Sequence, residues 1–183
     1  MSAACVRDLL PPPLATLLAT LPSSDTPDSS LPCRAPLLRP LLARRVPWPP
    51  ARADLICRPE ELRAALPAWL DAPAHSLPPL RLAYVLSTVP LPVAGALARA
   101  AFLACRQLWL ADFLPAERNL GLPAALCCRL LPGLWPLGAG SAPGRQWLER
   151  GGLEGCLYAA GLHAAARRTL LGGAALLVSC RPC

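Results

Sequence analysis

The chain has 183 residues, 54% of them hydrophobic, and 18 basic against 11 acidic side chains give it a net charge of +7. This length and composition suffice for one domain with a hydrophobic core. All the basic residues are arginines, spread singly or in pairs such as Arg44-Arg45 and Arg167-Arg168. Because a nucleic-acid binder more often shows a basic stripe with interleaved aromatics, we expect no nucleic-acid partner. Attraction to anionic lipid headgroups fits the charge better.

Alanine, leucine, proline, arginine and glycine dominate the composition. This bias indicates a GC-rich coding sequence, as in some large DNA viruses, and it equally fits a poorly constrained reading frame. Nine cysteines are an odd number, and the first twenty residues, with Asp8 and a triple proline, show no secretory signal. We therefore expect a reducing compartment and free thiols.

Residues 1–54 are interpreted as a proline-rich N-terminal arm, since 11 of the 24 prolines fall within residues 1–50. A short helix is possible over Leu14–Leu21. From Leu31 to Pro50, proline recurs every few residues, which predicts extended or irregular chain rather than a long helix.

Residues 55–168 are the predicted folded domain, and its first helix begins at Pro59-Glu60-Glu61, where a proline and two acids form a typical first turn. Pro67 is expected to kink this helix or end it. Its apolar face comprises Leu62, Leu66, Trp69 and Leu70. Residues 72–79 read as a loop. The apolar segment Leu80–Thr88 could be a strand or a helix, and without a second convincing strand we favour the helix.

The longest uninterrupted apolar pattern runs from Val93 to Leu114 and predicts a central helix of 22 residues. That length could also span a bilayer. Arg99, Arg106 and Asp112 would be costly in lipid, so a buried core helix is favoured.

Two further helical segments follow. Ala124–Leu131, between two prolines, is predicted to form a short apolar helix. In Arg145–Gly161, a helix carrying Trp147 ends at Gly151 and Gly152, and a second helix begins. Its apolar face has helical spacing and comprises Leu153, Cys156, Leu157 and Ala160. The predicted fold is therefore all-α, a single helical bundle around a central apolar helix.

Residues 169–183 form a short apolar C-terminal tail. Its run Thr169–Cys180 has 12 residues, fewer than the ~20 that a full membrane span requires. Either a weak membrane anchor beside Arg167-Arg168 or a core helix fits this pattern.

The sequence signals neither catalysis nor a cofactor. The two histidines, His75 and His163, have no cysteine or acidic partner at ligand or triad spacing, and no phosphate-binding loop is present. Cys180 and Cys183 have C-x-x-C spacing, but a zinc site needs a second pair of ligands. We expect no enzyme, no metal and no cofactor.

The segment W-L-E-R-G-G-L-E-G-C-L-Y-A-A-G, from Trp147 to Gly161, resembles the second homology motif of the Bcl-2 family, usually W-[IL]-x-x-x-G-G-W followed by an apolar helix. Asn119-Leu120-Gly121 resembles the N-W-G-R of the first motif, and both occur in the family's order before an apolar tail. One residue is missing between Trp147 and Gly151, and Leu153 replaces the second Trp. Leu66 and Asp71 also have the L-x-x-x-x-D spacing of the third motif.

The resemblance implies a divergent, viral-type apoptosis regulator, anti-apoptotic in direction, that holds an amphipathic helix of a pro-apoptotic partner in a surface groove. The family pattern places Asn119, Gly121, Trp147, Gly151 and Gly152 at this groove. Leu122 stands where the family has the arginine that pairs with an aspartate of the partner helix, so weak or narrow partner choice is expected. The implied location is the host cytoplasm, at mitochondria or another intracellular membrane. The alternatives are a small membrane-associated protein that inserts apolar helices in lipid, and a little-structured product of a GC-rich frame.

Overall fold

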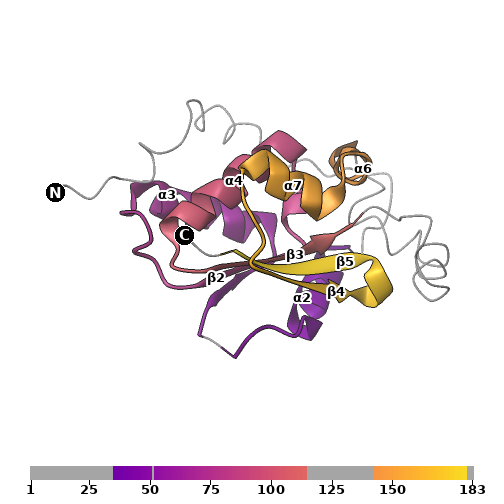
Figure 1. Cartoon of the computed structure of the whole chain (residues 1–183), viewed down its shortest axis with the longest axis horizontal. Helices are drawn as coiled ribbons and strands as arrows, with labels where there is room; N and C mark the ends of the chain where they lie inside the picture. Colours follow the sequence, from indigo (N-terminus) through magenta and orange to yellow (C-terminus); the bar gives the residue numbers. More distant parts are fainter. Residues whose placement is uncertain (1–34, 51, 115–141, 181–183) are drawn as a thin grey trace.

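A five-stranded mixed sheet forms the centre of the molecule, and helices cover both of its faces (Figure 1). The computed structural model describes residues 35–50, 52–114 and 142–180. The strands are β1 (Asp54–Ile56), β2 (Leu80–Ala83), β3 (Leu108–Phe113), β4 (Ala166–Leu170) and β5 (Ala175–Cys180). Their order is β1-β2-β3-β5-β4, with β1, β2 and β3 parallel and β5 antiparallel to both neighbours.

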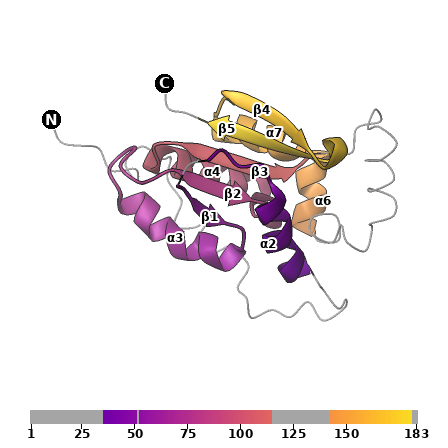
Figure 2. The same cartoon turned by 90° about the horizontal axis from the view of Figure 1, so that it is seen from below.

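Four helices pack on one face of the sheet, and one helix covers the other (Figures 1 and 2). The first group comprises α3 (Pro59–Asp71), α4 (Leu91–Ala104), α6 (Ala142–Glu149) and α7 (Gly152–Ala160). The opposite face carries α2 (Ala35–Arg45). Two short 3-10 turns, η2 (Leu86–Thr88) and η4 (Leu171–Gly173), follow β2 and β4. The alternation of β1, α3, β2, α4 and β3 is typical of parallel sheets, whose strands need crossover connections.

The predicted all-α bundle is wrong, because the described residues contain this five-stranded sheet. The central helix expected over Val93–Leu114 is two elements: α4 ends at Ala104, and β3 follows after a break at Arg106 and Gln107. All six residues of β3 are buried. A strand buried on both faces shows no alternation of apolar and polar side chains, so it merges with an apolar helix beside it.

The segment Leu80–Thr88 is likewise β2 and η2 rather than a helix, and the predicted tail contributes the last two residues of β4 and all of β5. Strand β5 lies inside the sheet between β3 and β4. The apolar run Thr169–Cys180 therefore comprises the end of β4, the turn η4 and the interior strand β5. Among the described residues, no helix is both long enough and apolar enough to cross a membrane.

Helix α2 corrects the prediction of irregular chain before residue 50. Pro40 lies inside this helix, where it removes one backbone hydrogen bond. The loss is offset by packing, because Ala43 and Val46 are buried against the sheet together with Tyr84, Trp109 and Phe113. The predicted helix at Leu14–Leu21 lies outside the described residues.

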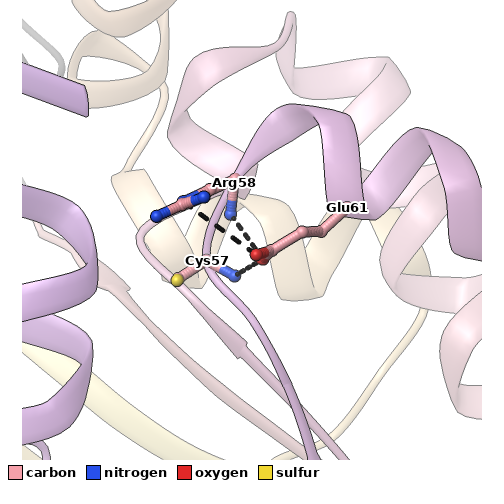
Figure 3. Close-up of polar contacts among 3 residues, drawn as sticks. All are labelled: Cys57, Arg58 and Glu61. Atoms are coloured by element: carbon pink, nitrogen blue, oxygen red, sulfur yellow. Dashed lines mark hydrogen bonds and ion pairs between the residues drawn. The ribbon is translucent and has the colours of Figure 1, made fainter. Parts of the chain in front are cut away.

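Helix α3 confirms the predicted start and apolar face. Its buried residues are Leu62, Leu66, Trp69 and Leu70. The carboxylate of Glu61 turns back and accepts hydrogen bonds from the backbone N–H groups of Cys57 (3.0 Å) and Arg58 (3.2 Å), as Figure 3 shows. The side chain thus satisfies donors just before the helix, as in one half of a capping box. Pro67 does not end the helix, which continues to Asp71.

Candidate functional site

Of the residues predicted to line a groove, Asn119 and Gly121 lie outside the described part of the chain. The structure brings Trp147, Gly151 and Gly152 together at the corner between α6 and α7, and the predicted order of helix, Gly-Gly break and helix is confirmed. Trp147 is fully buried, and its indole Nε1–H donates a 3.1 Å hydrogen bond to the carbonyl of Phe113. Here Trp147 packs in the core and joins the corner to the end of β3.

Gly151 and Gly152 adopt a backbone conformation at this corner that favours glycine. Gly151 has a φ of 92° and Gly152 a φ of 59°, values in the left-handed region that side chains disfavour. The predicted face of α7 is confirmed, since its buried residues are Gly152, Leu153, Cys156, Leu157 and Ala160. The corner thus turns the chain so that this face meets α4.

Replacing Gly155 with alanine is expected to lower the free energy of unfolding by about 1–3 kcal/mol, as overpacking of a rigid site does. A Cβ at this position would meet the carbonyl oxygen of Arg150, a backbone atom of the same corner. Chemical denaturation of the purified variant measures the effect. Tyr158→Ala is the matched control, because Tyr158 lies on the same helix and is 90% exposed. Equal stability of the two variants would contradict the close approach at Gly155.

A buried carboxylate lies near the end of β3. Asp112 is 1% exposed, and its two oxygens accept hydrogen bonds from the backbone N–H groups of Ser87 (3.1 Å) and Phe113 (2.9 Å). Burial raises the pKa of Asp112 to about 6, although the hydrogen bonds from Phe113 and Ser87 and the charge of Arg39 lower it. The carboxyl group joins η2 to β3 through these two hydrogen bonds.

A small pocket lies on the face of the sheet that α2 covers, between α2 and the turn that joins β4 to β5. Its volume is about 150 Å³, and it opens to solvent. The lining residues are Leu42, Arg45, Val46, Tyr84, Leu170 and Leu171. The ring of Tyr84 packs on Phe113 with 4.9 Å between ring centroids. The pocket therefore has an apolar lining with one cationic side chain.

Two residues of this pocket adopt a costly backbone conformation. Among the described residues, three that are not glycine have positive φ, and two of them, Tyr84 (54°) and Leu171 (51°), line the pocket. A bulky side chain in this region costs of order 1–3 kcal/mol, and such residues cluster at functional sites and ligand clamps. Gly172 and Gly173 continue the turn with φ values of 65° and 102°, so the strained leucine precedes two residues that adopt this conformation easily.

The surface around the pocket is apolar and basic. Leu41 is 55% exposed on α2, and Leu171 is 44% exposed on the turn. Arg44 and Arg45 end α2, and both are exposed. Cations at this position complement the helix dipole, and Arg45 also lines the pocket. We call the six pocket residues with Leu41 and Arg44 the α2–turn surface.

Comparison of the chain with protein-family models, curated proteins and solved structures finds no match. What this chain does must therefore be inferred from its own geometry.

The described thiols do not suit nucleophilic chemistry. Cys57, Cys105, Cys156 and Cys180 are free and buried. Burial raises the pKa of each, to about 12 for Cys105 and about 11 for Cys180, and the Glu61 carboxylate contributes at Cys57. Thiols with raised pKa values stay protonated near neutral pH and react slowly. Within residues 35–50, 52–114 and 142–180, no cluster of side chains could hold a metal ion.

The α2–turn surface could hardly be predicted from the sequence. Its residues come from three distant segments, near positions 42–46, 84 and 170–171, and no local spacing links them. One signal was present: Gly172-Gly173 inside an apolar run is typical of a hairpin turn. That signal predicts the turn, but it does not predict which helix packs against it.

Proposed function

We propose that this protein is a protein-interaction module that binds one apolar side chain of an acidic partner segment at the α2–turn surface. The observation that carries the proposal is the placement of two residues with strained backbone, Tyr84 and Leu171, in the lining of one pocket. Folding alone favours glycine or asparagine at a position such as 171. Leu171 has a strained backbone, and because its side chain is 44% exposed, burial within this fold stabilises it little. Contact with an apolar side chain of a partner would explain why a leucine stands at this position.

The pocket volume supports an apolar anchor of modest size. A cavity of about 150 Å³ lined by apolar side chains accommodates a ligand of one aromatic ring. It is smaller than the pockets that bind drug-sized ligands. A leucine or phenylalanine side chain of a partner fits this volume, and single anchors in small pockets often dominate the binding energy of an interface.

Charge supports an acidic partner. The chain carries a net charge of +7, and Arg44 and Arg45 lie at the surface itself. Arg168, on the neighbouring strand β4, is also exposed. Complementary charge speeds association and selects among partners, so a segment with carboxylates beside its apolar anchor is favoured over a neutral or basic segment.

A fluorescein-labelled peptide that alternates acidic and apolar residues and ends in leucine is the probe, and fluorescence anisotropy of the full chain is the measurement. We expect a dissociation constant of about 100 µM or lower. Leu171→Asn should weaken binding about tenfold, because it removes apolar contact area. The same change should leave the free energy of unfolding equal or about 1 kcal/mol higher, because asparagine tolerates this conformation.

Tyr158→Ala serves as the control, since it removes an exposed apolar side chain on the other side of the sheet. Binding that Tyr158→Ala reduces as much as Leu171→Asn would point to a nonspecific apolar contact. Absence of binding by the cooperatively folded chain would contradict the proposed function.

The apoptotic function implied by the resemblance stays a prediction. Its groove belongs to an all-α bundle, and the described fold is built on a sheet instead. Amphipathic helices of pro-apoptotic proteins do carry apolar and acidic side chains, so they belong in the same titration, each with an Asp→Ala control. The proposed host-cell and mitochondrial location and the membrane contact of residues 169–183 likewise stay predictions.

A further inference from the structure

Strand β4 leads directly into the pocket. It is the outer strand of the described sheet and pairs with β5 alone among the described strands. Residues 166–169 are all exposed, and the next two, Leu170 and Leu171, line the pocket. The outer edge of β4, which no other described strand pairs with, therefore leads into the pocket.

A free strand edge offers backbone N–H and C=O groups to an added strand. Charged side chains on an edge protect it from association with other copies of the chain. Here they are arginines: Arg167 makes a 2.8 Å ion pair with Glu154, and Arg168 is exposed. The positive charge of these arginines disfavours pairing of β4 with the β4 edge of a second copy of the chain. It favours pairing with a partner strand that carries acidic side chains.

Arg45 is placed to bind the C-terminal carboxylate of such an added strand. It is the last residue of α2 and is exposed at the pocket. In the described structure it makes no ion pair or hydrogen bond with another residue. A guanidinium group matches a carboxylate with two parallel hydrogen bonds. At the C-terminus of a polypeptide, the carboxylate and an apolar side chain are attached to the same Cα, so the two can reach Arg45 and the pocket together.

We infer that the α2–turn surface recognises the C-terminal end of a partner chain. The last side chain, leucine or phenylalanine, occupies the pocket, its α-carboxylate pairs with Arg45, and the preceding residues add to the edge of β4 as a strand. This inference rests on the proposed function and specifies its ligand. An internal apolar residue between acidic side chains lacks the carboxylate next to the anchor, and it would bind through the pocket alone.

The test compares the acidic, leucine-ended peptide as the free acid with the same peptide amidated at its C-terminus, using the full chain and fluorescence anisotropy. The free acid should bind about ten- to a hundredfold more tightly, which corresponds to one charge-assisted contact. Arg45→Gln should reduce that ratio to about one. Arg150→Gln removes the same charge from an exposed position at the α6–α7 corner and should leave the ratio unchanged. Hydrogen exchange should show protection of the amides of residues 166–169 by the free acid.

The outcomes separate the two proposals. Equal binding of the acid and the amide by the unmodified chain overturns recognition of the terminus while the pocket proposal stands. Tight binding of the acid without protection at residues 166–169 overturns strand addition. Failure of both peptides to bind overturns the proposed function and this inference with it.

Discussion

Replacing Trp147 with alanine is expected to lower the free energy of unfolding by about 3–5 kcal/mol, the usual cost of removing a buried tryptophan. The side chain is fully buried, and its Nε1–H donates to the Phe113 carbonyl at 3.1 Å. The substitution therefore leaves a cavity between α6 and the sheet and also removes a hydrogen bond that joins the corner to β3. Chemical denaturation of the full chain, followed by circular dichroism, measures the loss.

Trp147→Phe separates the two contributions. Phenylalanine keeps an aromatic ring in the site but cannot donate the hydrogen bond, so we expect a smaller loss of about 1–3 kcal/mol. The result also discriminates between the two roles given to this residue. In an open binding groove, Trp147→Ala would change stability by about 0.5 kcal/mol or less, and such a small value would contradict the buried role.

Two parts of the fold could be predicted because their signals are local. Helix α3 has a proline and two acids in its first turn and an apolar face at helical spacing, and the structure has both. The α6–α7 corner was predictable because Gly151 and Gly152 interrupt a helical pattern. Each of these signals lies within about ten residues, a range over which backbone preference and side-chain periodicity determine structure.

The sheet could not be predicted in the same way. β1 has three residues and β2 has four, too few to establish an alternation. β3 and β5 are buried almost throughout, and a fully buried strand has the same apolar sequence as a buried helix. The boundary between α4 and β3 does carry a polar signal, Arg106-Gln107, which interrupts the apolar run. Because the apolar pattern continues over 22 residues, it favoured one long helix in place of a helix and a strand. The predicted fold class was therefore all-α, which is wrong.

Asp112 illustrates how one polar residue can mark a buried strand. In the sequence, it argued against a membrane span. In the structure, it lies one residue before the end of β3 and accepts hydrogen bonds from the backbone of η2 and of β3 itself. A carboxylate is tolerated there because it binds two backbone N–H groups. Its burial has a measurable consequence for stability.

The stability of the protein should decrease between about pH 4 and pH 7 through Asp112. Its pKa is raised from 3.8 to about 6 by burial, so the folded state retains a proton that the unfolded chain releases at lower pH. The stabilisation is complete below the unfolded pKa and is lost as the pH rises through the folded one. The two pKa values correspond to a loss of about 3 kcal/mol. Other carboxylates also titrate in this range, so the measurement needs a reference protein that differs at this site alone.

Asp112→Asn is that reference, because asparagine has the same shape and does not ionise. Like a protonated aspartic acid, it keeps one oxygen acceptor for the two N–H groups of Ser87 and Phe113. Denaturation of both proteins at pH 4, 5, 6 and 7 should therefore show a stability difference, wild type minus variant, that falls by about 2.4 kcal/mol across the series, since part of the full loss lies outside this range. Parallel stability curves would show that the carboxyl group ionises at an ordinary pKa in the folded state, and a difference that rises with pH would show that its hydrogen bonds outweigh its burial.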